Sequence, residues 1–196
     1  LSLHDALPIL PKYQALRINP LKTERDTFLR QAPFSLNRVP WTTNGYYYSG
    51  NDQPGRHPYH EAGVYYIQEP SAMAPAEYLM AEPGERILDL CAAPGGKSTQ
   101  IACSMQGEGL IVCNEIHPAR AKILSENIER MGVCNALVTN ETPQKLSDNF
   151  REYFDRILVD APCSGEGMFR KNEDACDEWS PENVENCAAR SEERRV

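Results

Sequence analysis

Three short stretches of the sequence carry residue types that could bind a ligand or perform chemistry. The first is the turn CAAPGGK at residues 91–97, which follows an apolar run at residues 87–90. The second is Glu115, which follows another apolar run, and the third is the segment DAPC at residues 160–163. Glycine lets a backbone approach a ligand closely, a helix that begins after such a turn offers unpaired N–H groups, and a cysteine in a polar turn can act as a nucleophile. These stretches predict a site for a polar or charged ligand with a thiol facing it.

The glycine turn departs from two common phosphate-binding loops. A P-loop has the pattern GxxxxGK[ST], and Gly96, Lys97 and Ser98 match its end, but position 91, where its first glycine belongs, is Cys91. The dinucleotide fingerprint GxGxxG also fails, because Gly95 and Gly96 are adjacent and no third glycine follows. These departures leave a nucleoside-binding turn on an α/β sheet, which need not hold a chain of phosphates.

Glu115 stands where an acidic residue can bind the sugar of a nucleoside. It comes after the apolar run at residues 110–113, at the carboxyl end of an expected second strand. In nucleotide-binding βαβ units an acidic residue about 20 positions after the glycine turn hydrogen-bonds the ribose hydroxyls. An isolated acid after a strand is more simply a solvated loop residue, but its separation from the turn favours the ribose contact.

Taken together, CAAPGGK, Glu115 and the segment DAPCSGEGMFRK at residues 160–171 resemble the motifs of the Fmu/Sun-type (NOL/NOP/Sun) RNA (cytosine-5)-methyltransferases. The resemblance covers residues 13–189. It implies a Rossmann-like class I methyltransferase fold, S-adenosylmethionine as the cofactor, and RNA, either ribosomal or transfer RNA, as the substrate. It also implies these cofactor-binding residues: Cys91, Ala92, Ala93, Pro94, Gly95, Gly96, Lys97, Glu115, Thr142 and Asp160.

The resemblance divides the chemistry between two cysteines. A thiolate that adds to carbon 6 of cytosine makes carbon 5 nucleophilic enough to take a methyl group from the sulfonium. In the family the cysteine of the Pro-Cys motif, here Cys163, helps to release the methylated product, and the attacking cysteine lies in a downstream Thr-Cys motif. This chain contains no Thr-Cys pair, and it diverges into RSEERRV where family members continue through further strands. We therefore expect a fragment truncated after its fourth strand and inactive by itself.

Some of these assignments have alternatives. Asp160 contacts the cofactor or the target cytosine in one interpretation, and only caps the following turn in the other. Lys97 is either a ligand contact or a cation at the start of a helix. Thr142 stands where the family has an aspartate near the adenine, so that Asn140 or Glu141 could make this contact in its place.

An alternation of strands and helices must position these groups. Helical spacing from Lys97 onward, from Pro118 to Gly132 and from Pro143 separates four apolar, strand-like runs, at residues 87–90, 110–113, 136–139 and 154–159. This order is typical of a mostly parallel sheet flanked by helices. Just before it, a helix is expected to begin at Pro70-Ser71 and to carry Met73, Ala76 and Met80 on one face.

The chain divides into three parts. We expect residues 1–12, which do not begin with methionine, to be a non-native or disordered leader, and residues 61–196 to form a methyltransferase domain that is incomplete at its carboxyl end. Residues 13–60 are expected to form a small α+β portion with an alternating strand at residues 16–22 and a helix at residues 24–30. The resemblance implies that this portion binds RNA. Its tyrosines could stack on bases or simply pack. Cations gather between positions 12 and 38, which favours RNA contact near the amino end over a merely solvated charged surface: Lys12, Arg17, Lys22, Arg25, Arg30 and Arg38.

Composition narrows the class of protein. A net charge of −8 argues against a protein that grips nucleic acid with its whole surface. Seven cysteines without a CxxC pair indicate neither a zinc site nor a disulfide framework, and the four histidines lack metal-like spacing. This cysteine usage predicts a reducing, cytoplasmic setting, and we expect a monomer without a metal. Because no apolar stretch reaches about 18 residues, we also expect no membrane span.

Two other functions fit parts of the pattern. One is a nucleoside-binding or RNA-binding module that keeps the fold without the reaction. The other is an amino-methylating enzyme. Such enzymes carry an aromatic residue where this chain has Cys163, which favours cytosine chemistry.

Overall fold

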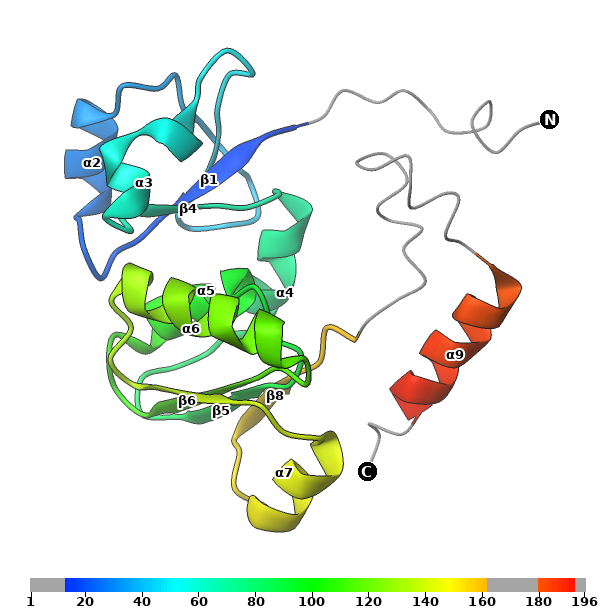
Figure 1. Cartoon of the computed structure of the whole chain (residues 1–196). Helices are drawn as coiled ribbons and strands as arrows, with labels where there is room; N and C mark the ends of the chain where they lie inside the picture. The colour runs from blue at the N-terminus through cyan, green and yellow to red at the C-terminus, as the bar shows by residue number, and fades with distance from the viewer. Residues whose placement is uncertain (1–12, 162–179, 193–196) are drawn as a thin grey trace. The chain divides into compact units, whose positions relative to one another are not determined.

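We describe a computed structural model of the chain in which residues 13–161 and 180–192 are placed (Figure 1). The chain forms two units, one of residues 13–160 and one of residues 1–12 with 161–196. In the second unit, the helix α9 (Pro181–Glu192) has Glu182 in its first turn, where an acidic side chain interacts favourably with the helix dipole. The fold and the candidate site below belong to the first unit.

A parallel sheet forms the centre of the larger part of this unit. Its strand order is β7-β6-β5-β8, and all three pairings are parallel. The predicted α/β fold with a mostly parallel sheet is therefore confirmed, although the fourth strand is shorter than residues 154–159. The strands are β5 (Arg86–Asp89), β6 (Leu110–Asn114), β7 (Ala136–Thr139) and β8 (Arg156–Leu158).

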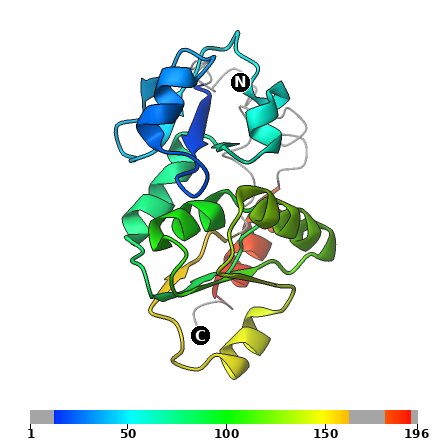
Figure 2. The ribbon, with the colours of Figure 1, turned by 90° about the vertical axis from the view of Figure 1, so that its left-hand side faces the viewer.

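Helices cover both faces of this sheet. The helices α5 (Gly96–Met105) and α6 (Pro118–Met131) lie on one face, and α7 (Pro143–Asn149) lies on the other (Figures 1 and 2). Local signals fix the ends of α6: Pro118 occupies its first turn, and Gly132 ends it in the left-handed conformation, with φ of 74°. The sequence therefore predicted this helix correctly at both ends.

The two faces of β5 explain how the core divides. Ile87 packs in a cluster with the apolar residues of α5 and α6, such as Ile101 and Leu124. Leu88 and Leu90 point the other way and pack with Leu146 of α7. Successive side chains of a strand alternate between faces, so β5 is buried on both sides, as its continuous apolar run predicted.

A second, antiparallel sheet precedes the parallel one, with strand order β2-β3-β1-β4. Because β4 pairs with β1, this sheet uses residues on both sides of position 60, where we expected the first portion to end. Its strands are β1 (Ala15–Ile18), β2 (Asn37–Arg38), β3 (Gly45–Tyr47) and β4 (Tyr65–Ile67); nearby are α2 (Arg25–Gln31), α3 (Pro58–Glu61) and the 3-10 turn η1 (Pro54–Arg56).

The strand expected at residues 16–22 forms, but β1 is shorter than predicted, and all four of its residues are buried. Leu16 and Ile18 pack into the core of the small sheet. Arg17, on the opposite face, is covered because it hydrogen-bonds groups of α5. The alternating sequence of this strand therefore places apolar and charged side chains on opposite faces, and both faces are buried.

The segment before β5 also differs in part from the prediction. It forms a 3-10 turn, η2 (Ser71–Met73), followed by α4 (Ala74–Leu79). Met73 and Ala76 are buried as expected, whereas Met80 is 68% exposed and ends the helix with φ of 51°. The helical stripe therefore fails at Met80, because the chain turns away one residue before the side chain could reach the core.

Candidate functional site

The predicted site residues gather where the parallel strands end. The glycine turn follows β5, Glu115 follows β6, Thr142 comes after β7 and Asp160 after β8. The carboxyl ends of parallel strands meet at one edge of the sheet, where α/β proteins bind their ligands. Cys163, the predicted product-release thiol, lies outside the described residues.

Side chains hold the glycine turn through its carbonyl groups. Each carbonyl oxygen of residues 93–96 accepts a hydrogen bond from a side chain, and the donors come from β1, α5 and α6. The conformation of the turn is therefore fixed by contacts from three elements. The bonds are Arg120 Nη2 to Ala93 O (3.0 Å), Asn127 Nδ2 to Pro94 O (2.8 Å), Thr99 Oγ1 to Gly95 O (2.7 Å) and Arg17 Nη2 to Gly96 O (3.1 Å).

The two glycines serve close packing within the protein. Gly95 has φ of 110°, which side-chain-bearing residues rarely adopt, and a Cβ there would lie 3.2 Å from Leu124 Cδ1. A Cβ on Gly96 would lie 3.3 Å from the ring of Tyr66. We expected glycine here because it lets a ligand approach. The structure adds another reason, since α6 and β4 press against the same two residues.

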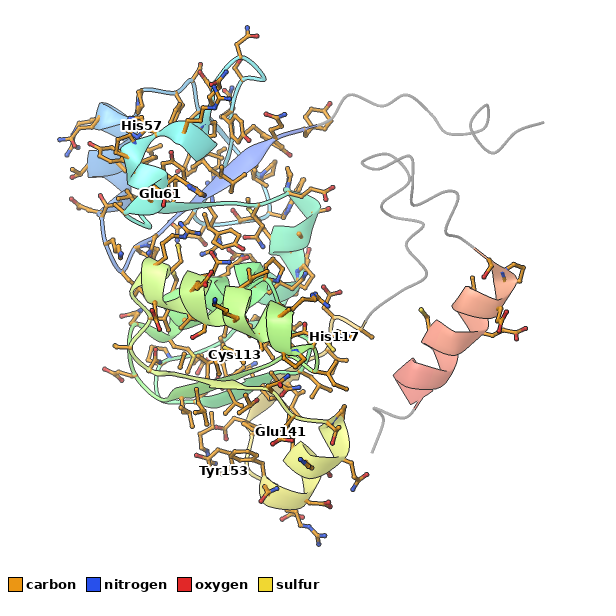
Figure 3. All side chains as sticks on the ribbon, in the orientation of Figure 1. His57, Glu61, Cys113, His117, Glu141 and Tyr153 are labelled. Carbon is orange, nitrogen blue, oxygen red and sulfur yellow. The ribbon has the colours of Figure 1, made fainter. Side chains whose placement is uncertain are left out.

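Glu115 is buried and oriented rather than solvated. It is only 3% exposed, and its Oε1 accepts a hydrogen bond from the backbone N–H of His117 at 3.0 Å. Its Oε2 lies 3.3 Å from Nη1 of Arg120, the residue that also binds the turn at Ala93. The interpretation of Glu115 as a solvated loop residue is therefore wrong, and Arg120 links this carboxylate to the glycine turn. Figure 3 labels His117 beside the start of α6.

Lys97 and Asp160 form an ion pair at the same edge. Lys97 Nζ lies 2.6 Å from Asp160 Oδ2, with Asp160 about half exposed. The pair connects the first turn of α5 to the end of β8. It gives Lys97 a structural partner, and the exposed side of Asp160 leaves that carboxylate accessible.

The segment after β7 has several internal hydrogen bonds. Thr142 Oγ1 accepts from the N–H of Lys145 at 3.3 Å and so caps α7. Asn140 Nδ2 donates to the backbone oxygen of Glu115 at 2.6 Å, and Glu141, labelled in Figure 3, pairs with the side chain of Lys145 at 2.9 Å. The Thr142 hydroxyl can still donate a hydrogen bond, because capping uses only its acceptor.

The sequence reasoning did not single out two buried polar residues of the site. Asn114 joins three segments: its Nδ2 donates to the oxygens of Leu90 and Glu141, and its Oδ1 accepts from Thr139 Oγ1 and from the N–H of Glu141. Asp89, 1% exposed, accepts from Ser98 Oγ at 2.7 Å. The signal available in the sequence was a polar residue inside or at the end of an apolar strand.

The carboxyl group of Asp89 is electrostatically unusual. Its Oδ1 has no hydrogen-bond partner among the described residues. Burial, helped by the charge of nearby Asp160, raises its pKa to about 6, whereas the hydrogen bond from Ser98, the charge of Lys97 and a hydrogen bond from the backbone N–H of Cys91 act in the opposite direction. A buried carboxyl with an unused oxygen next to a glycine turn is a candidate ligand contact.

The described cysteines supply no activated thiol on β6. Cys113 is fully buried, and burial raises its pKa to about 12, so it stays protonated and inert. Within residues 13–161 and 180–192, no three metal-ligating side chains of His, Cys, Asp or Glu come together. The same residues include no helix with the length and apolar character needed to cross a membrane.

The cations of the N-terminal portion are not all available to RNA. Arg17 is 1% exposed, and Lys22 Nζ donates to the backbone oxygens of Ala62 and Arg130. Arg25 and Arg30 are exposed, with contacts inside their own helix. Tyr46 is buried in the small core and its two neighbours pack against core residues, which favours packing over base stacking for the tyrosines.

Comparison with known proteins extends over almost the whole chain. A family model of the 16S rRNA methyltransferase RsmB/F matches residues 76–194. A model of the N-terminal domain of 16S rRNA methyltransferase RsmF matches residues 3–70, so the match begins inside the leader that we expected to be non-native.

Curated relatives carry the same description. Ribosomal RNA small subunit methyltransferase F of Escherichia coli O157:H7 is 41% identical over 192 residues, covering 93% of this chain and 40% of the relative. The protein of the same name from Vibrio vulnificus strain YJ016 is 41% identical over 187 residues, covering 91% and 40%. The chain thus spans about 40% of the length of these relatives.

Two solved structures resemble most of this chain. A methyltransferase homolog protein from Pyrococcus horikoshii is 32% identical, with a TM-score of 0.74 over 84% of this chain and 55% of that one. NSun6 from Pyrococcus horikoshii, solved with SFG, has a TM-score of 0.79 over 93% of this chain and 71% of that one; at 20% identity it shows the fold alone. The structure has a hydrogen-bonded glycine turn and a buried glutamate after β6, and the family models match both portions of the chain. The chain belongs to the 16S rRNA methyltransferase RsmB/F family.

Proposed function

We propose that this chain carries the S-adenosylmethionine-binding half of an rRNA methyltransferase. A protein of the relatives' full length would transfer the methyl group to carbon 5 of a cytosine in small-subunit rRNA. The observation that carries the proposal is the link between Glu115 and the glycine turn: Arg120 binds both, so an acidic acceptor and the turn are held in one fixed arrangement.

The donor and acceptor groups at the sheet edge suit a nucleoside with a positively charged sulfonium. We propose that Glu115 accepts hydrogen bonds from the ribose hydroxyls, because each carboxylate oxygen can accept more than the one bond it makes here. The unpartnered Oδ1 of Asp89 offers a further acceptor. Residues 91–97 would line the cofactor, and Thr142 would donate its hydroxyl proton toward the adenine. The bound cofactor supplies an electrophilic methyl group.

Asp160 has the exposure needed to reach a second ligand. Its carboxylate is held on one side by Lys97 and is about half exposed. We propose that it contacts the cofactor or the edge of the target cytosine, and that Cys163 assists product release. The attacking thiol of the family is absent from these 196 residues, which contain no Thr-Cys pair. We therefore propose that this chain binds the cofactor but does not methylate RNA by itself.

Calorimetric titration of the chain with S-adenosylmethionine tests cofactor binding. Wild-type protein should bind, and Glu115→Gln should bind at least tenfold more weakly, since a hydrogen bond to a charged acceptor contributes roughly 1.5–3 kcal/mol. Glu126→Gln is the matched control, because that exposed glutamate of α6 only reaches Lys122 at 4.0 Å. Wild-type protein that fails to bind would refute the proposed function.

Transfer of tritium from labelled cofactor to RNA tests the second part. We expect no transfer by the 196-residue chain and transfer by a full-length relative under the same conditions. Incorporation of label into RNA by this chain would show that the missing Thr-Cys motif is dispensable. Binding without transfer is also what a non-catalytic RNA-binding module would show. Mutation of the cysteine equivalent to Cys163 in a full-length relative separates the two, because only an enzyme would accumulate a covalent RNA adduct.

We also propose that the protein is a monomer that acts in the cytoplasm. The cytoplasmic location is supported by the cysteines, since Cys103, Cys113 and Cys134 form no disulfide, as is usual in a reducing compartment. Light scattering at several protein concentrations tests the monomer, which predicts a mass that does not change with concentration.

A further inference from the structure

Arg17 is a buried guanidinium that joins the small sheet to the glycine turn. It lies in the middle of β1 and is 1% exposed. Its neighbours across this contact, Gly96 and Thr99, are 79 and 82 positions further along the chain. Arg17 is therefore a direct contact between the N-terminal portion and the first turn of α5.

Nearly all of its donors are used. Nε donates to Gln68 Oε1 at 3.0 Å, and Nη1 lies 3.7 Å from Cys103 Sγ. Nη2 donates to Gly96 O at 3.1 Å and to Thr99 Oγ1 at 2.8 Å. Thr99 Oγ1 in turn donates to Gly95 O at 2.7 Å. The guanidinium thus reaches two consecutive carbonyls of the turn, one directly and one through the threonine hydroxyl.

These acceptors are neutral, which is unusual for a buried cation. Among the described residues, no carboxylate lies within ion-pair distance of Arg17. Burial lowers its pKa, and Cys103, Tyr66 and the more distant Glu77 oppose that shift. Burying a charge without an opposite partner is unfavourable for stability. An apolar side chain would avoid that cost but would leave Gln68 Oε1 and the carbonyl of Gly96 without this donor, so the feature that distinguishes arginine here is its contact with the turn.

Tyr66 completes the contact. Arg17 Cζ lies 5.9 Å from the centre of its ring, and Arg130 Cζ lies 5.6 Å from the same centre. The ring also packs against Gly96. The ring therefore lies within cation–π distance of both guanidiniums and provides electrostatic compensation that the neutral acceptors lack.

We propose that Arg17 is a positioning residue for the cofactor turn, so that β1 of the N-terminal portion sets the conformation of residues 95–99 for binding. Its contribution to cofactor affinity rests on the proposed function. Its effect on the order of the turn does not, because that effect is present without any ligand.

Hydrogen exchange of the unliganded chain measures the order of the turn. In Arg17→Gln, the backbone amides of residues 95–101 should exchange at least tenfold faster than in wild type. Lys22→Met is the matched control, because Lys22 ties the same portion to Ala62 and Arg130 and makes no contact with the turn. That variant should leave exchange of residues 95–101 within twofold of wild type. Arg17→Lys, which keeps the charge and can still reach one acceptor, should be intermediate.

Thr99→Val is a second variant in case Arg17→Gln unfolds, because it removes the relaying hydroxyl and leaves Arg17 and the side-chain shape in place. It should also speed exchange of these amides. Wild-type exchange in Arg17→Gln, or in Thr99→Val if Arg17→Gln does not fold, would overturn the inference.

Affinity for S-adenosylmethionine gives the second readout. We expect about tenfold weaker binding by Arg17→Gln and unchanged binding by Lys22→Met. If wild-type protein does not bind the cofactor, the proposed function fails, while the exchange comparison still decides the role of Arg17. If wild-type and Arg17→Gln proteins bind equally, the role of Arg17 in cofactor binding is refuted while the proposed function stands.

Discussion

Replacement of Asp89 by asparagine should stabilise the protein in a manner that depends on pH. Burial raises the pKa of this carboxyl from 3.8 to about 6. The folded state therefore keeps the proton of Asp89 to a higher pH than the unfolded state does. Its stabilising contribution is complete below about pH 4, declines as pH rises toward 6, and is lost above 6. A difference of about two pH units corresponds to about 3 kcal/mol of unfolding free energy.

The asparagine side chain of Asp89→Asn would carry no charge at any pH. The unfolding free energy of this variant at pH 8 should exceed that of wild type by up to about 3 kcal/mol, and the difference should shrink toward zero near pH 4. The asparagine oxygen can still accept from Ser98, so the existing hydrogen bond can be kept. We also expect weaker binding of S-adenosylmethionine, because a carboxylate acceptor is lost from the site.

Urea denaturation at pH 4.5, 6 and 8 measures the difference directly. Asp148→Asn on the exposed face of α7 is the matched control, with an expected change within about 0.5 kcal/mol at each pH. If Asp89→Asn lowers stability by the same amount at all three values, the ionised form of Asp89 is not strained in the folded state and the reasoning fails.

Two further changes test other parts of the site. Lys97→Met removes the cation that lowers the pKa of Asp89. The unfolding free energy of this variant should therefore decline with rising pH at a higher midpoint than that of wild type. An unchanged pH profile would contradict the coupling between Lys97 and Asp89. Thr142→Val removes the cap of α7 and should cost about 1 kcal/mol in urea denaturation. Thr43→Val, at an exposed position outside any helix, is the comparison, and equal losses in both variants would argue against the capping role.

Local signals explain what the sequence could predict. Pro118 and Gly132 mark the ends of α6, and the apolar runs before Glu115 and at residues 136–139 are strands within one residue of the prediction. The alternation of these elements was sufficient to identify the parallel sheet. For the same reason, the sequence indicated that the glycine turn, Glu115 and Asp160 follow the carboxyl ends of parallel strands.

Contacts between distant segments account for what the sequence could not predict. Arg17 looks like one more surface cation until α5 covers it, and Asp89 looks like a strand-end acid until its hydrogen bond with Ser98 is known. Met80 matches the helical spacing, but the chain reverses direction there. In each case the environment depends on a segment or a turn that periodicity does not encode.

The pairing of β1 with β4 bears on how such a protein can be dissected for expression. A recombinant piece that starts at residue 61 would retain β4 but lose the strand that pairs with it. It would also remove the Arg17 donor from the side chains of Gln68 and Thr99, while the carbonyl of Gly96 keeps a bond from Thr99 Oγ1 at 3.3 Å. A buried acceptor left without a donor costs roughly 1–3 kcal/mol. Poor solubility or weak cofactor binding by such a piece would therefore result from the loss of β1 and Arg17, and would not describe the intact protein.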